Sequence, residues 1–71
     1  MRNLELKRAR ARMLLTQQEL AERVGYGLRE KDICLMETGR KQPSEILAKR
    51  IAETLETDVR IIFPDIVGYI E

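Results

Sequence analysis

The side chains of this sequence that could do chemistry are cations and amides, without the partners that catalysis needs. The 71 residues contain no histidine, and Cys34 is the only cysteine. A metal cage of His and Cys ligands therefore cannot be assembled, and no Ser or Cys has a plausible base partner. Gly25-Tyr26-Gly27 is too short for a phosphate loop and does not follow a strand. We therefore expect no enzyme, no metal site and no cofactor.

The basic residues are concentrated at one end of the chain. Residues 1–12 carry five basic side chains against Glu5 alone, and residues 44–71 carry six acidic side chains against three basic ones. Residues 13–43 are balanced, so the net charge is only +1. A basic front and an acidic back would orient the molecule against a polyanion. Chance clustering on solvated helix faces would give the same distribution, so charge alone leaves both interpretations open.

Apolar residues at helical spacing, with capping residues between them, predict about five short helices. The expected helices cover residues 4–13, 17–24, 29–38, a stretch from Ser44 to Leu55, and residues 58–63. The predicted N-caps are Asn3, Thr16, Ser44 and Asp58, and the predicted stops are Gly25, Gly39 and Pro64. Because aromatic residues are few, the core must be aliphatic. The length predicts one domain over residues 1–71, an all-α compact bundle.

The second and third expected helices have the outline of a helix-turn-helix unit over residues 17–38. They are short, and a tight turn with Gly25 and Gly27 joins them. In such a unit the second helix lies in the major groove, and the first helix crosses the DNA backbone. Residues 29–38 are therefore the expected recognition helix.

Two stretches resemble the Cro/lambda-repressor (Xre-type) family. Thr16-Gln17-Gln18-Glu19-Leu20-Ala21 is similar to its "S/T-Q-x-E-L-A" opening, and the stretch from Ile33 to Ser44 is similar to its "I-S-x-I-E-N-G-x-R-x-P-S" segment. The apolar stripe from Leu47 to Leu55 and the end at 59–63 also match, so the resemblance covers residues 4–63. It implies a sequence-specific regulator of transcription that binds double-stranded DNA, a repressor of the prokaryotic or phage type.

The resemblance also assigns contacts with the DNA backbone. Gln17 opens the second helix, where a side-chain amide and free backbone N–H groups can bond a phosphate. Thr38, Arg40 and Lys41 lie at positions where family members touch phosphates. The alternatives are a plain surface residue at Gln17 and a solvated loop after the third helix.

Base contacts are expected from the exposed face of the third helix. The residues on this face are Arg29, Glu30, Lys31, Cys34 and Leu35. Arg and Lys can bond guanine, Glu can accept from cytosine, and Leu can meet a thymine methyl. Glu30 and Asp32 could instead simply favour the positive helix N-terminus.

The resemblance gives one further pair a structural role. Glu37 matches a near-buried acid of the family, and Arg10 matches its partner in the first helix. We expect these two to form a brace that contacts no DNA. Removing one partner of a buried pair costs about 3–5 kcal/mol.

The sequence departs from the family pattern at two places. The turn at residues 25–29 is two residues longer than usual, and the third helix lacks the usual Ser or Thr cap. The recognition helix could therefore sit differently against the second helix. Leu14 occupies a position where the family often has Gly, and a left-handed leucine costs on the order of 1 kcal/mol. The first helix could also end differently.

The last residues suggest a surface for pairing. The apolar groups there are Val59, Ile61 and Ile62 of the fifth helix and Ile66, Val67, Tyr69 and Ile70 of the tail at 65–71. We expect a homodimer on DNA, because two copies match a palindromic operator. The alternative is a tail that folds back over its own thin core.

A regulator that also binds a protein partner is the alternative function. An antitoxin that carries the same domain would use the tail to bind a protein partner, a toxin. No signal peptide or membrane-spanning run is visible. We therefore expect a cytoplasmic protein with no membrane partner.

Overall fold

The computed structural model describes residues 2–67 and contains there the helices α1 (Leu4–Arg12), α2 (Gln17–Val24), α3 (Glu30–Glu37), α4 (Glu45–Thr54), α5 (Val59–Ile62) and α6 (Pro64–Val67). Four of them, α1, α2, α4 and α5, begin directly after a residue that the sequence offers as an N-cap. Asn3, Ser44 and Asp58 each accept a backbone N–H of the helix that follows. Thr16 and Glu19 form the reciprocal capping box. The all-α fold is confirmed.

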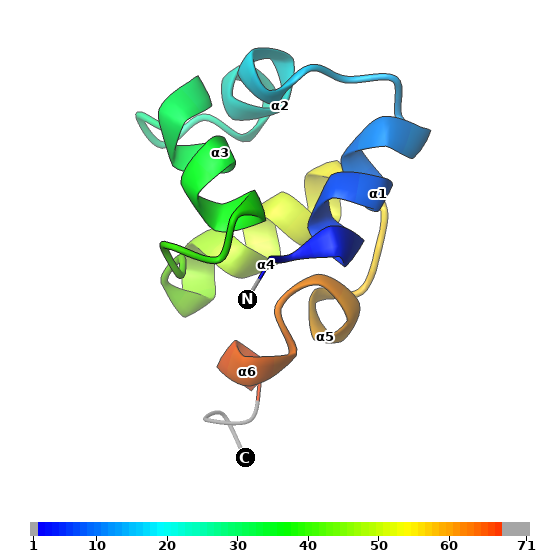
Figure 1. The fold of residues 1–71 in the computed structure, drawn as a ribbon, viewed down its shortest axis with the longest axis vertical. Coiled ribbons are helices and arrows are strands. Elements are labelled where there is room, and N and C mark those ends of the chain that lie inside the picture. Colours follow the sequence, from blue (N-terminus) through cyan, green and yellow to red (C-terminus); the bar gives the residue numbers. More distant parts are fainter. Residues whose placement is uncertain (1, 68–71) are drawn as a thin grey trace.

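The core is aliphatic, as expected, apart from the buried Phe63, and every helix from α1 to α5 contributes to it. Its largest fully buried side chains are Leu6, Leu20, Val24, Ile33, Met36, Ile51 and Ile62. The pair α2 and α3 lies at one end of the molecule and α5 with α6 at the other, with α4 between them (Figure 1). This packing holds α2 and α3 against each other and leaves one side of α3 to solvent.

Pro64 follows the end of α5, as expected, but it also opens a further short helix, α6, which was not predicted. It is the first residue of α6, because a proline at the first position of a helix has the required φ and needs no N–H partner. Ile66 of this helix packs against the core. The beginning of the tail therefore folds back, while Tyr69 and Ile70 lie outside the described residues. No helix within residues 2–67 is long and apolar enough to cross a bilayer.

Leu14 takes a left-handed backbone conformation, which favours glycine. Its φ is +58°, directly after α1, and 89% of its surface is exposed. Its N–H donates to the Ala11 carbonyl at 3.0 Å and so ends the helix. The backbone strain of a left-handed leucine is on the order of 1 kcal/mol, and no packing of the side chain offsets it.

Candidate nucleic-acid interface

The long turn between α2 and α3 is built from three consecutive residues with positive φ. Gly25, Tyr26 and Gly27 have φ of 78°, 57° and 70°, and the Leu28 N–H donates to the Gly25 carbonyl at 3.0 Å. Glycine adopts this conformation without strain, which explains two of the three residues. Leu28 then returns to the core and packs against it. The longer turn thus leads α3 back onto α2.

Arg50 of α4 contacts both the end of α2 and this turn. Its Nε donates to the Val24 carbonyl at 3.2 Å, at the end of α2. Its guanidinium carbon lies 5.6 Å from the centroid of the Tyr26 ring, within the range of a cation–π contact. The end of α2 and the exposed tyrosine are therefore both tied to α4.

The exposed side of α3 carries most of the residues that the sequence assigns to base contacts. Arg29, Glu30, Lys31 and Cys34 are exposed, whereas Ile33, Met36 and Glu37 face the interior. Leu35 is only half-buried. Its carbonyl accepts the N–H groups of Arg40 and Lys41 at 2.9 and 3.2 Å, so the following loop folds back toward it.

The N-cap of α3 is Arg29, and no side-chain oxygen within residues 2–67 caps the first turn of this helix. The Asp32 carboxylate accepts the backbone N–H of Arg29 at 2.9 Å and the Nζ of Lys41 at 2.7 Å. The bonds from Lys41 and then from Arg29 hold the pKa of Asp32 below its usual value. Lys41 is therefore already paired within the protein, whereas its neighbour Arg40 is exposed and in no ion pair of residues 2–67.

A buried carboxylate joins the three helices α1, α2 and α3. Glu37 is only 7% exposed, and its Oε2 accepts from Arg10 Nε at 2.6 Å. Its Oε1 accepts from Arg10 Nη2 and from Gln17 Nε2, both at 3.1 Å. Arg10 Nη1 also donates to the Leu15 carbonyl at 2.8 Å. The hydrogen bond with Glu37 raises the pKa of Arg10, against a smaller opposite effect of burial.

Gln17 and Thr38 line the same cavity, but each side chain already donates a hydrogen bond to another group of the protein. One amide hydrogen of Gln17 is given to Glu37, and the Thr38 hydroxyl lies 3.0 Å from the Cys34 carbonyl, to which it donates. Arg2 and Lys7 line the same cavity. The sequence predictions missed these two cations, although the basic character of residues 1–12 was the available signal.

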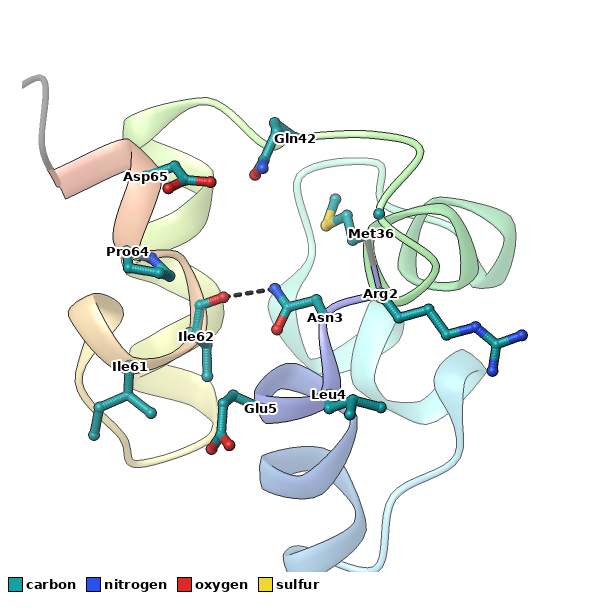
Figure 2. A pocket seen from close by; sticks show the side chains of 11 residues that line it. Arg2, Asn3, Leu4, Glu5, Met36, Gln42, Ile61, Ile62, Pro64 and Asp65 are labelled. Atoms are coloured by element: carbon teal, nitrogen blue, oxygen red, sulfur yellow. Dashed lines mark hydrogen bonds between the residues drawn. The ribbon is translucent and has the colours of Figure 1, made fainter.

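A larger cavity of about 460 Å³ lies between the start of α1 and the pair α5 and α6 (Figure 2). Arg2 and Leu4 line this cavity as well as the first one. The Asn3 side-chain amide donates to the Ile62 carbonyl beside it at 2.6 Å. Leu4 and Ile61, which are 50% and 52% exposed, lie at its rim. Within residues 2–67 no group of three His, Cys, Asp or Glu side chains could hold a metal ion.

Comparison with known proteins finds two archaeal relatives. The chain is 40% identical over 58 residues to an "Uncharacterized HTH-type transcriptional regulator" of Archaeoglobus fulgidus. The aligned stretch covers 82% of this chain and 79% of the relative. The chain is also 49% identical over 50 residues to a protein of the same description from Methanothermobacter thermautotrophicus, and this aligned stretch covers 70% of each chain. No family model matches the chain, and no solved structure matches it.

Proposed function

The chain belongs to the HTH-type transcriptional regulators, and we propose that it is a Cro/lambda-repressor (Xre-type) repressor that reads double-stranded DNA with α3. The observation that carries this proposal is the division of α3 into two sides. One side is buried against the core through Ile33 and Met36, while the other offers Lys31 and Cys34 to solvent. A helix held in this way can enter the major groove without unfolding any part of the domain.

Base recognition in this proposal falls to five residues around the exposed side of α3. Arg29 and Lys31 would donate to guanine O6 and N7, and Glu30 would accept from cytosine N4. Cys34 and Leu35 would make the apolar contacts. Leu35 contributes less than its place in the sequence suggested, because it is half-buried.

Backbone recognition falls to residues around α2 and the loop after α3. Arg40 is exposed and has the charge for a phosphate contact. Gln17 can use its second amide hydrogen and the backbone N–H groups at the start of α2. Thr38 would have to release its bond to Cys34, and Lys41 its bond to Asp32, before either could bind a phosphate.

Selection of binding sites from randomised duplex DNA tests this function. The purified protein should enrich one short motif, and Lys31→Ala should relax the preference at a defined position by about 1–3 kcal/mol. Lys49→Ala is the matched control, because Lys49 is an exposed lysine on α4, away from α3. Enrichment of no motif, or the same change in both variants, would overturn the assignment of α3.

We further propose that two copies pair on the DNA through α5, with Ile61 as the exposed apolar contact. Ile61 is 52% exposed, whereas Ile62 is buried and Val59 half-buried, so Ile61 is the outward apolar residue of α5. Two copies would place two recognition helices about 10 base pairs apart on a symmetric operator.

Sedimentation velocity with two variants tests the pairing. Ile61→Glu should convert a dimer into a monomer, and Ile46→Glu should not, although Ile46 on α4 is even more exposed at 73%. A wild-type protein that is monomeric at high concentration and binds a single half-site one-to-one would contradict the dimer.

A further inference from the structure

We propose that the cavity between α1, α2 and the end of α3 binds a phosphate of the DNA backbone, with Lys7 and Arg2 as its cationic contacts. This inference rests on the proposed DNA-binding function and adds α1 to the elements that hold the duplex. The cavity has a volume of about 300 Å³ and opens to solvent. Arg2, Lys7 and Arg10 line it from the start of the chain, Gln17 from α2, and Glu37 with Thr38 from the end of α3.

The charge of the cavity is positive despite the buried Glu37. That carboxylate accepts two hydrogen bonds from Arg10 and one from Gln17, so Arg10 compensates its charge within the fold. Lys7 and Arg2 are both exposed, and neither takes part in an ion pair among residues 2–67. Two uncompensated cations therefore remain at the mouth of the cavity.

Of the other cations of α1, Arg10 lines this cavity but is paired with Glu37, whereas Arg8 and Arg12 do not line it. Arg8 is paired with Glu5 at 3.0 Å. Arg12 lines a different cavity, which Ala9, Met13 and Leu55 border. Lys7 is therefore the cation of α1 that lines this cavity without an ion pair among residues 2–67.

The occupant that fits is a phosphate of a long polyanion. The cavity lies next to the first turn of α2, whose N–H groups have no partner within the helix and favour an anion. It also contains Thr38, the residue that directly follows α3, so a strand of DNA that α3 contacts would pass over it. A free phosphate ion would use the same chemistry, and the experiment must separate the two.

The test compares Lys7→Gln with Arg12→Gln, which removes one charge from the same helix outside the cavity. The DNA affinity of each variant is measured over a range of salt concentrations, on the selected operator and on an unrelated duplex. Lys7→Gln should reduce the slope of log affinity against log salt by about 0.9, one phosphate contact, equally on both duplexes. Arg12→Gln should leave the slope unchanged, and Lys7→Arg should restore it. Thermal unfolding monitors the fold of each variant, which both exposed sites should leave intact.

The possible outcomes separate this inference from the function on which it rests. If the wild type binds DNA with a steep salt dependence and both variants have the same slope, the cavity is not a phosphate site although the function stands. If the wild type binds no DNA, both fail. A last arm replaces chloride with inorganic phosphate at equal ionic strength. Stabilisation of the wild type by phosphate that Lys7→Gln abolishes, with no change of its DNA slope, would indicate a free-anion site and overturn the proposal.

Discussion

Arg10 and Glu37 lie 27 residues apart in the sequence, and the guanidinium of one donates two hydrogen bonds to the carboxylate of the other, at 2.6 and 3.1 Å. The pair joins the first helix to the last turn of α3. Because Gln17 donates to the same carboxylate, the start of α2 is fixed with it. The position of Gln17, a proposed phosphate contact, relative to α3, the proposed recognition helix, therefore depends on the buried Glu37 carboxylate.

Removal of this buried charge should destabilise the fold. We expect Glu37→Ala and Arg10→Ala each to lower the free energy of unfolding by about 3 kcal/mol, because each leaves its partner without compensation. The double variant should cost much less than the sum. Denaturant unfolding measures all three, with the exposed Glu53→Ala as control. Additive losses would remove the proposed brace.

The ion pair between Asp32 and Lys41 should restrain DNA binding. Asp32→Asn keeps an oxygen that can accept the Arg29 N–H, but it releases Lys41 and removes a negative charge from α3. We expect the affinity for any duplex to rise about threefold to tenfold at low salt. Fluorescence anisotropy measures the change. A weaker complex would mean that the ion pair positions the loop for binding.

The same ion pair should make stability depend on pH in the acid range. The pKa of Asp32 is lowered in the folded state, so its contribution is complete above the pKa of the unfolded chain, about 3.9. It is lost as the pH falls through the lowered value. The difference in melting temperature between wild type and Asp32→Asn should therefore be constant near neutral pH and shrink below about pH 4. A difference that grows on acidification would contradict this.

Leu14 offers a site where stability can be gained. Asparagine tolerates a left-handed backbone better than leucine does, and the exposed side chain has little packing to lose. Leu14→Asn should raise the free energy of unfolding by up to about 1 kcal/mol. Leu4→Asn, at a half-exposed leucine within α1, is the control and should not stabilise. Equal effects in denaturant unfolding would argue against strain at Leu14.

The loop after α3 should contribute affinity without sequence preference. Arg40→Ala should weaken binding to all duplexes by the same factor and reduce the salt slope by about 0.9. Competition assays with a set of single-base operator variants measure both properties. A changed order of preference among these duplexes would show that the loop reads bases.

The helices that could be predicted from the sequence are those with local signals. Thr16, Ser44 and Asp58 cap their helices by bonds to residues two or three positions away, and such bonds follow from residue type alone. Pro64 shows the limit of local reasoning. A proline can precede or open a helix, and the contact of Ile66 with the core decides between them.

The site was predictable to a smaller degree. The resemblance brought Arg10 and Glu37 together correctly in space, but nothing local indicates that Lys41 reaches back nine residues to Asp32. Likewise, Arg50 could not be linked to Tyr26, because the contact exists only once α4 packs beneath the turn. The base and phosphate contacts stay predictions, since they depend on a duplex that the fold alone does not define.

The central claim is that this domain reads DNA sequence through α3, and titration of one labelled duplex against another tests it most directly. Affinities for the selected operator and for a scrambled duplex of equal length should be measured at several salt concentrations. We expect the operator to bind at least about a thousandfold tighter than the scrambled duplex at physiological salt. We also expect a log–log salt slope of several units on both duplexes. Equal affinities for the two duplexes, or no binding at low salt, would contradict it.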